Sequence, residues 1–509
     1  MKKIFLDGNS LKINDLIAIG RKDAFVELTE EARQRVSEGR AVVDKIVREN
    51  RVVYGVTTGF GQFASVVIDK KDVEELQYNL LRSHAAGVGN FFPEDIARMI
   101  MTLRANVLAK GRSGIALETL ELLIDMINKN VYPLIPEKGS VGASGDLAPL
   151  AHLALVLIGE GKARIGEFEG TGEQVLEKEG LKPVKLKAKE GLALINGTQV
   201  MTAIGAKVLY KAINLVKNSD IAGSLTLEAL KGTVVAFDKR IHNERPYKGQ
   251  IGTAENFRKI LVDSEIAKSH KDCGKVQDSY TLRCIPQVHG PVRDTMNYVK
   301  KMLEIEMNSA TDNPMVFAEQ GELVSGGNFH GESVAFLMDF LKIAIAELGN
   351  ISERRTERLV NPALSELPPF LVKDGGLNSG FMLAHVTAAA LVSENKVLSH
   401  PASVDSIPTS ANKEDHVSMG TIAARKALEI VDNAETIVGI EILSAVQALE
   451  FLKPLNPAKP LIPVIEKIRK QVPCWDKDRY MADDIGKIKN IVESGELIDL
   501  IEKLIGKLN

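Results

Sequence analysis

The feature that most limits the fold of this chain is a proline-free, amphipathic stretch between residues 420 and 452. Over about 33 residues, apolar side chains recur every three or four positions, which is the period of an α-helix. At 1.5 Å per residue such a helix would be roughly 50 Å long. Other long helices must cover its apolar face, so the stretch predicts a large helical bundle.

Shorter stretches with the same period are predicted as helices at about 118–130, 197–217, 332–350 and 383–398. The last of these is apolar around too much of its circumference for a surface helix, which indicates burial, including burial between subunits. Aromatic residues make up only 5% of the chain, which favours helix over sheet. The predicted fold class is therefore mainly α.

Two stretches interrupt this pattern and suggest how the chain is divided. Residues 164–190 are rich in Gly, Glu and Lys, which predicts a surface excursion, and four prolines between Pro454 and Pro463 end the long helix. We predict a smaller mixed N-terminal lobe at 1–215, a central long-helix bundle at 216–452 and a C-terminal helical segment at 453–509.

Charge and cysteine content exclude several classes of protein. The 64 basic and 67 acidic residues leave a net charge of -3, which excludes a globally basic nucleic-acid-binding protein. The cysteines Cys273, Cys284 and Cys474 are too few for a disulfide framework or a zinc cluster, so we expect a reducing compartment, the cytoplasm. The longest nearly apolar stretch, 147–159, is shorter than the ~20 residues of a membrane-spanning helix. We therefore expect neither nucleic acid nor membrane as a partner.

Glycine and other small residues gather in three segments: 55–61 (GVTTGFG), 139–146 (GSVGASGD) and 325–331 (SGGNFHG). In a helix-rich chain these are loops where the backbone approaches another group, although any one of them alone could be a tight turn. None has the spacing of a phosphate-binding loop. Asp146 stands where a nucleophile elbow needs glycine, and the nine histidines show no metal-binding pair, so no metal site is predicted.

The tripeptide Ala143, Ser144, Gly145 can carry a less common chemistry. The Gly145 amide nitrogen can attack the Ala143 carbonyl, because glycine has no side chain in the way. Loss of two waters, one of them from the Ser144 side chain, then leaves a methylidene-imidazolone ring, which is a strong electrophile made without an external cofactor. The same tripeptide occurs by chance in about one chain of this size in five, so its surroundings must decide.

Those surroundings closely resemble the aromatic amino-acid ammonia-lyases. Segment 139–152 (GSVGASGDLAPLAH) resembles the family's signature. Matching motifs follow in family order along nearly the whole chain: 54–61 (YGVTTGFG), 83–87 (SHAAG), 194–199 (LINGTQ), 277–284 (QDSYTLRC), 308–314 (NSATDNP), 325–330 (SGGNFH) and 410–419 (SANKEDHVSM). The resemblance implies the ammonia-lyase/fumarase-like long-helix fold, and a homotetramer in which three chains contribute to each site.

The resemblance also implies roles for single residues. Ala143, Ser144 and Gly145 would form the ring, and Tyr54 would be the base that removes the substrate's β-proton. Arg283 would bind the substrate carboxylate with its planar fork. Polar groups that orient the substrate and the ring would come from Asn196, Gln277 and Tyr280, while Phe329 would contact the ring or the substrate.

Two positions bear on the substrate. His84 lies where phenylalanine enzymes of the family usually have apolar residues, and Glu414 lies where phenylalanine and tyrosine enzymes usually have Gln. An imidazole has ring nitrogens that need partners, so this pair favours L-histidine and the product trans-urocanate. Tyrosine enzymes can also have a histidine at position 84, and Thr57 departs from the Asn of many bacterial histidine enzymes.

Three alternatives stay open at this stage. The substrate could be phenylalanine or tyrosine, or the same electrophile could serve an aminomutase that yields a β-amino acid. The chain could also be a helical scaffold with an inactive site, although all the residues that carry a family role are present.

Overall fold

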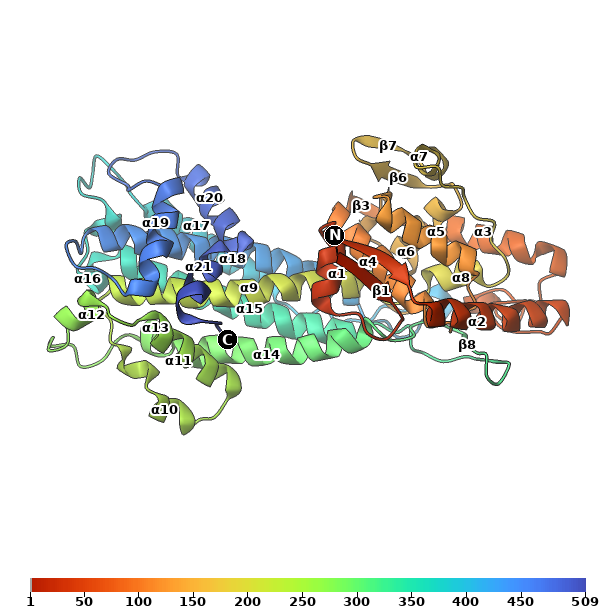
Figure 1. Ribbon diagram of the computed structural model, residues 1–509, viewed down its shortest axis with the longest axis horizontal. Coiled ribbons are helices and arrows are strands. Elements are labelled where there is room, and N and C mark those ends of the chain that lie inside the picture. Colours follow the sequence, from red (N-terminus) through yellow and green to blue (C-terminus); the bar gives the residue numbers. More distant parts are fainter. Residues whose placement is uncertain (1) are drawn as a thin grey trace. The chain divides into compact units, whose positions relative to one another are not determined.

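The computed structural model describes residues 2–509, which are predominantly α-helical (Figure 1). Internal contacts divide the chain into two compact units. Unit 1 comprises residues 1–210, 300–339 and 401–425, and unit 2 comprises 211–299, 340–400 and 426–509. The three-part division predicted from the sequence remains a prediction.

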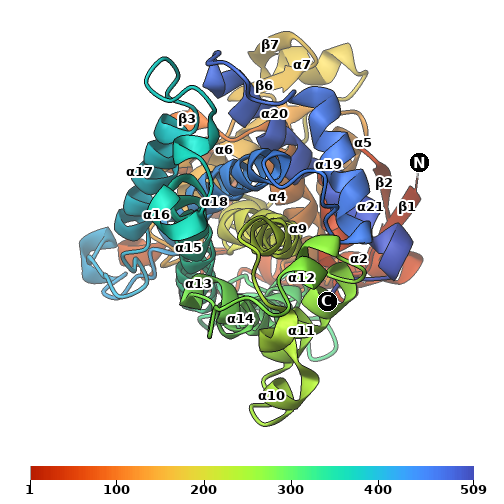
Figure 2. The same cartoon turned by 90° about the vertical axis from the view of Figure 1, so that its left-hand side faces the viewer.

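Four long helices contribute residues to both units. They are α9 (Gln199–Ala229), α14 (Ile285–Glu306), α15 (Glu332–Val360) and α18 (Gly420–Glu450). Helix α18 ends just before the proline-containing segment, as its sequence predicts. Helices α9 and α15 run beyond the predicted ends at residues 217 and 350. Figure 2 shows α9 surrounded by the other three.

Unit 1 combines helices with short strands. Its other helices are α1 (Ile13–Gly20), α2 (Glu30–Arg48), α3 (Val73–His84), α4 (Glu94–Leu108), α5 (Leu117–Asn128), α6 (Leu147–Leu157), α7 (Gly172–Lys178) and α8 (Glu190–Ile195). The strands are β1 (Lys2–Leu6), β2 (Ala24–Leu28), β3 (Val88–Phe91), β4 (Tyr132–Pro133), β5 (Pro136–Lys138), β6 (Lys162–Ile165), β7 (Phe168–Thr171), β8 (Met315–Phe317) and β9 (Glu322–Val324). Three sheets have two strands, β1-β2 (parallel), β3-β5 and β8-β9, and one has the order β4-β6-β7.

Sequence explains where several of these helices begin and how they pack. Thr29 caps α2, because its side chain accepts a hydrogen bond from the Ala32 amide at 3.1 Å, and Glu30 and Glu31 follow in the first turn. Helix α6 is apolar on nearly all sides and is almost entirely buried, as a helix without a polar face must be. The predicted excursion at 164–190 forms the β6-β7 hairpin and α7.

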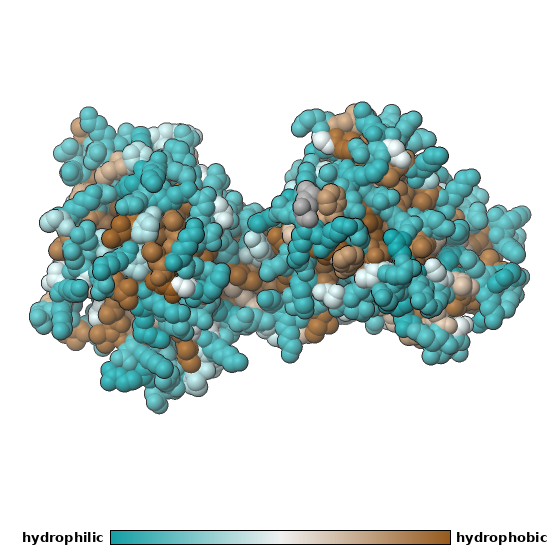
Figure 3. All heavy atoms as spheres, viewed as in Figure 1, coloured by the Kyte–Doolittle hydropathy of each residue, from teal (hydrophilic) through white to brown (hydrophobic). Residues whose placement is uncertain are grey.

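Unit 2 is built of helices. The described residues form α10 (Lys239–Asn243), α11 (Lys248–Ile260), α12 (Glu265–Ser269), α13 (Tyr280–Arg283), α16 (Pro362–Ser365), α17 (Met382–Leu398), α19 (Ile462–Gln471), α20 (Met481–Ser494) and α21 (Glu496–Ile505). Among residues 2–509, no helix is long and apolar enough to cross a membrane. On the face drawn in Figure 3, hydrophilic side chains cover most of the surface.

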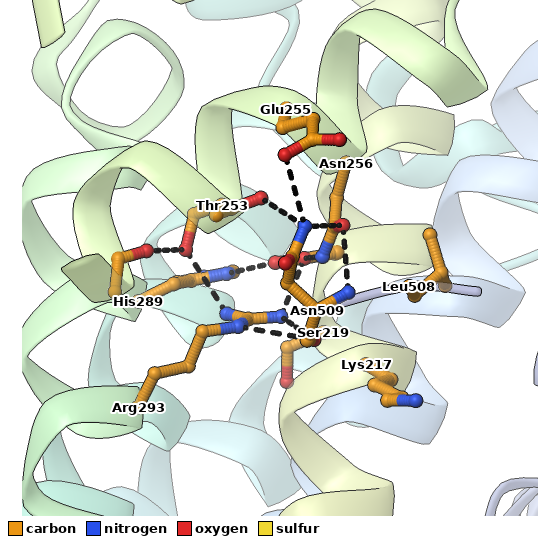
Figure 4. Close-up of polar contacts among 12 residues, drawn as sticks. Lys217, Ser219, Thr253, Glu255, Asn256, His289, Arg293, Leu508 and Asn509 are labelled. Carbon is orange, nitrogen blue, oxygen red and sulfur yellow. Dashed lines mark hydrogen bonds and ion pairs between the residues drawn. The ribbon is translucent and has the colours of Figure 1, made fainter. Parts of the chain in front are cut away.

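A buried polar cluster connects the helices of unit 2. The Asp220 carboxylate of α9 accepts hydrogen bonds from His289 Nδ1 at 2.8 Å, Arg293 Nη2 at 2.7 Å and Asn256 Nδ2 at 2.8 Å. In Figure 4, His289, Arg293 and Asn256 point toward one another. Burial alone would raise the pKa of Asp220, but Arg293 and His289 outweigh it and the pKa is lowered.

The same cluster continues through a buried ion pair. Arg355 of α15 donates two hydrogen bonds to Glu441 of α18, at 2.5 and 2.8 Å. The hydroxyls of Thr226 and Ser352 also donate to Glu441, at 2.7 and 2.6 Å. Arg355 Nη1 lies 3.5 Å from His289 Nε2, so one connected network joins five helices. We call the residues Asp220, Asn256, His289, Arg293, Arg355 and Glu441 the bundle cluster.

Candidate active site

The loop between β5 and α6 carries the tripeptide Ala143, Ser144, Gly145 and depends on glycine. Gly145 has a φ of +75°, in the left-handed region. A Cβ atom on Gly145 would lie only 2.2 Å from the carbonyl oxygen of Gly197. The two glycines form a parallel bridge, so the loop lies directly against the turn between α8 and α9. A residue with a side chain therefore does not fit at position 145.

Asp146 fastens this loop to two of the long helices. Its carboxylate is fully buried and accepts hydrogen bonds from the amides of Val200 and Met201 at 3.0 and 2.9 Å, in the first turn of α9. It also accepts from the hydroxyls of Ser140 at 2.8 Å and of Thr421, near the start of α18, at 2.5 Å. Burial raises the pKa of Asp146, and these hydrogen bonds reduce the rise. Helices α9 and α18 thus set the shape of the loop.

A cavity of about 900 Å³ opens over the loop within unit 1. Ser144 and Ala143 line it, as do most of the residues predicted for the site. The predicted residues on its wall are Tyr54, His84, Ala143, Ser144, Asn196, Phe329 and Glu414. Sequence motifs separated by hundreds of residues therefore meet around one cavity.

Glu414 is bonded directly to the loop. Its Oε1 accepts a hydrogen bond from the Ser144 hydroxyl at 2.6 Å, and its Oε2 accepts from the hydroxyls of Thr409 at 2.7 Å and Ser410 at 2.9 Å. Burial alone would raise the pKa of Glu414, but these hydrogen bonds and the nearby His84 lower it overall. Glu414 is therefore ionised at neutral pH.

The backbone that leads to Glu414 is strained. Ser410, Ala411 and Asn412 have φ values of 54°, 54° and 63°, which is a full run of left-handed residues without glycine. Thr409 and Glu414 close this turn with two backbone hydrogen bonds, of 3.0 and 3.3 Å. Strain of this kind is kept where the surroundings enforce it, which is typical of functional sites.

Asn196 connects the loop to the turn before α9. Its side-chain nitrogen donates to the carbonyl oxygen of Ser144 at 2.8 Å. Its Oδ1 is buried and has no hydrogen-bond partner among the described residues. A buried, unsatisfied acceptor beside a cavity points to a missing donor, which a bound molecule could supply. Asn196 and the cramped Gly145 thus fit a ring made from residues 143–145.

His84 and Tyr54 face the cavity from other segments. His84 ends α3, and its Nδ1 lies 3.1 Å from the Ser83 hydroxyl. Burial lowers the pKa of His84, although the charge of Glu414 acts in the opposite direction, so the imidazole is neutral at pH 7. The Tyr54 hydroxyl accepts a hydrogen bond from the Gly61 amide at 3.4 Å.

Three predicted residues lie elsewhere in the chain. Gln277, Tyr280 and Arg283 belong to unit 2 and do not line the 900 Å³ cavity. The Arg283 guanidinium carbon lies 4.5 Å from the centre of the Tyr280 ring, and Arg283 Nε is buried without a partner among the described residues. Tyr280 is 70% exposed. Their predicted roles in the site stay predictions.

Sequence reasoning missed the groups that support the predicted residues. Thr409 and Ser410, which bind Glu414, and Asp146, which fixes the loop, were not singled out as site residues. They do lie in or next to the quoted motifs, so position within a motif was the available signal. Arg104, in α4, lies outside all of these motifs but contacts Asn196.

Sequence comparison assigns these features to a known family. A family model for aromatic amino acid lyases matches residues 11–470. The chain belongs to the aromatic amino acid lyase family. It is 56% identical over 505 residues to the histidine ammonia-lyase of Alkaliphilus oremlandii, with 99% of each chain covered.

Solved structures of the aromatic amino acid lyase family agree. The histidine ammonia-lyase of Trypanosoma cruzi matches with a TM-score of 0.92 and 46% identity, over 98% of this chain and 95% of that one. A tyrosine aminomutase from Streptomyces globisporus matches with a TM-score of 0.94 and 39% identity, over 100% of both chains. The predicted mainly helical, long-helix fold is confirmed.

Proposed function

We propose that this chain is an ammonia-lyase that converts L-histidine to trans-urocanate and ammonia. The observation that carries the proposal is the pairing, on one cavity wall, of an ionised Glu414 and a neutral His84 beside the loop at 143–145. The high identity to histidine ammonia-lyases over nearly the full chain supports it.

We propose a methylidene-imidazolone formed from Ala143, Ser144 and Gly145 as the prosthetic group. It would supply the electrophile that makes the amino group of the substrate a better leaving group. The geometry at Gly145 and the bond from Asn196 to the Ser144 carbonyl support this assignment. No metal or external cofactor is part of the proposal.

Side chains of the cavity remove the proton, bind the imidazole ring and exclude water. Tyr54, in its deprotonated form, accepts the proton from the β-carbon of histidine, while ammonia leaves the α-carbon and a double bond forms between the two carbons. Glu414 accepts a hydrogen bond from an imidazole N–H, and His84 pairs with the other ring nitrogen. Phe329 covers the substrate ring, which excludes water.

We further propose that the carboxylate of the substrate is bound by Arg283 from another copy of the chain, together with Gln277 and Tyr280. The proposed assembly is a homotetramer with sites shared between subunits. The exposed position of Tyr280 supports this arrangement, as does Arg283 Nε, which has no hydrogen-bond partner within residues 2–509. A cytoplasmic location is also proposed, since all three cysteines are free thiols.

Incubation with histidine tests the proposal. The ultraviolet absorbance of urocanate should rise with histidine and not with phenylalanine or tyrosine. The matched control is Ser144→Ala, which should produce no rise. Turnover of phenylalanine or tyrosine instead, or a β-amino acid product, would contradict the proposal and favour the sister enzymes or an aminomutase.

The intact mass tests the prosthetic group without any substrate. A chain that has formed the ring weighs two waters less than its sequence. An unmodified mass together with no turnover would favour the rival interpretation, a helical scaffold with an inactive site.

A further inference from the structure

A buried cation lies beside the turn that carries Asn196. Arg104 of α4 has no exposed surface, and its Nη1 donates to the backbone oxygen of Asn196 and to Gln199 Oε1, both at 2.8 Å. Its Nε and Nη2 have no hydrogen-bond partner among the described residues. Burying a guanidinium with some of its N–H groups unpaired costs free energy of folding. We therefore ask what the contacts that Arg104 does make contribute to function.

Among the described residues, no carboxylate forms a hydrogen bond with this cation. Burial lowers the pKa of Arg104 to about 10, with the charge of Asp312 acting in the opposite direction, so the side chain is charged at neutral pH. The Asp312 carboxylate is bonded to Lys189 Nζ at 3.0 Å and to the Asn313 amide at 2.7 Å. Arg104 therefore donates its hydrogen bonds to two neutral oxygens of the segment 196–199.

The contacts of Arg104 connect two of the sequence motifs, 194–199 and 308–314. Gln199, which accepts from Arg104, donates in turn to the Thr311 hydroxyl at 2.8 Å. A Cβ atom on Gly197 would lie 2.9 Å from Arg104 Nη1, so the guanidinium packs tightly against the residue next to Asn196. The segments 194–199 and 308–314 are thus fixed to each other and to α4 next to the loop.

We propose that Arg104 is a positioning residue that acts through Asn196. Its rigid fork fixes the backbone of Asn196, so that the Asn196 side chain stays on the Ser144 carbonyl while residues 143–145 cyclise and while substrate reacts. The inference rests on the proposed function. It assigns Arg104 to the rate of ring formation and of elimination, and not to binding of the substrate.

The chain offers a matched control six residues earlier on the same helix. Arg98 is also buried, at 2% exposure, and also donates to main-chain oxygens, those of Ile19 at 2.8 Å and Ile127 at 2.6 Å. Arg98 also donates to Asn130 Oδ1 at 2.8 Å, and among the described residues it has no bond to the segment 196–199. Replacing either arginine removes the same kind of buried fork, but only Arg104 touches Asn196.

The experiment compares Arg104→Lys and Arg104→Met with Arg98→Lys and Arg98→Met. For the Arg104 variants we expect kcat to fall about 100-fold while KM stays within about threefold, because a misplaced group costs rate more than affinity. Intact mass should also show a larger share of chains that keep both waters. The Arg98 variants should lose thermal stability but keep kcat and the mass deficit.

A double-mutant cycle shows whether the effect passes through Asn196. If it does, Arg104→Lys should cost much less in an Asn196→Ala background than in the native chain. Additive effects, or equal effects of the Arg104 and Arg98 variants on kcat and mass, would overturn the proposal. So would failure of both Arg104 variants to fold while the Arg98 variants fold, because the role would then be structural.

The two proposals fail separately. If the native chain shows the mass deficit but does not turn over histidine, the substrate assignment is wrong, and the mass of the Arg104 variants still reports on positioning. If the native chain turns over histidine and the Arg104 variants match the Arg98 variants, only the inference about Arg104 is wrong.

Discussion

Two buried polar clusters, one in each unit, are paired to different degrees. In the bundle cluster of unit 2, the carboxylates of Asp220 and Glu441 each accept at least three hydrogen bonds from neighbouring helices. We call Arg104, Ser144, Asn196 and Glu414 of unit 1 the loop cluster. Among the described residues, Asn196 Oδ1 and part of the Arg104 guanidinium have no hydrogen-bond partner, and Asn196, Ser144 and Glu414 line the cavity.

The difference separates two uses of buried polarity. A fully paired network fixes helices and contributes to stability and specificity of packing. A partly paired one costs stability but presents groups that a ligand can satisfy. The comparison therefore predicts that substitutions in the loop cluster change turnover and those in the bundle cluster change stability.

The strongest test on the side of the loop cluster is Ser144→Ala. We expect turnover of histidine to fall by about a thousandfold or more, since the ring cannot form. The free energy of unfolding should change by about 1 kcal/mol or less, because one hydrogen bond to Glu414 is lost. Initial rates and chemical denaturation measure the two effects. A variant that keeps its rate would remove the electrophile from the mechanism.

The strongest test on the side of the bundle cluster is Arg355→Met. It leaves Glu441 buried without its cation, so the free energy of unfolding should fall by about 3–5 kcal/mol. The control is Lys259→Met in α11, whose partner Glu255 is 42% exposed, and it should cost about 1 kcal/mol or less. Turnover per folded chain should stay unchanged, and a large change in kcat would break the comparison.

A smaller effect is expected at the strained turn before Glu414. Ala411→Gly relieves the left-handed backbone, worth about 1 kcal/mol, and loosens the position of Glu414. We therefore expect KM for histidine to rise a few-fold with no loss of thermal stability. The control Ala41→Gly, at an exposed position in the middle of α2, should lose about 1 kcal/mol. Equal destabilisation by both would show that residues 410–412 carry no strain.

A further test of the comparison concerns pH. Lys211 of α9 pairs with Asp432, Glu435 and Glu493, at 2.5, 2.9 and 3.4 Å. Burial raises the pKa of Glu435 to about 8 from an ordinary 4.5, against the opposing effect of Lys211. Between these values the unfolded chain releases the proton and the folded chain keeps it, so stability should fall as pH rises.

Glu435→Gln should flatten this dependence, since an amide does not titrate. Thermal midpoints at about pH 5, 7 and 9 measure the slope in both chains. Burial also lowers the pKa of His289 in the bundle cluster below its ordinary 6.5. Below about pH 6.5 the unfolded chain therefore binds a proton that the folded chain does not, so this histidine should make stability rise with pH in the acidic part of the range, and the effect of Glu435→Gln is best measured between about pH 7 and 9. An unchanged slope in the variant would show that another group titrates.

Helix periodicity predicted the elements but not their full length. The stretch predicted to end near residue 217 continues through Asn218, Ser219 and Asp220, all fully buried in α9. In the same way α15 continues beyond residue 350 through Ser352 and Arg355. A polar run looks like the end of a helix in a sequence. Such a polar run becomes part of the core only because its side chains have partners on other helices, and a sequence pattern does not show where those partners lie.

The candidate site was predictable where a residue lies in a motif. Tyr54, Asn196, Phe329 and Glu414 line one cavity, as the motif match implies. Arg104 could not be found in this way, because a lone arginine in an amphipathic helix is usually a surface residue. The contact with Asn196 depends on how α4 packs, and that is a property of the folded chain.

The position of Asp146 bears on the order in which the chain folds and cyclises. Its carboxylate binds Thr421, which lies 275 positions later, so the loop takes its final shape only after most of the polypeptide has been made and packed. Cyclisation would then be a late and irreversible reaction that takes place only after the helices have packed. The mass of a chain would therefore show whether its core had ever packed. A molecule whose core never packed would still carry both waters, even if it was later found among soluble protein.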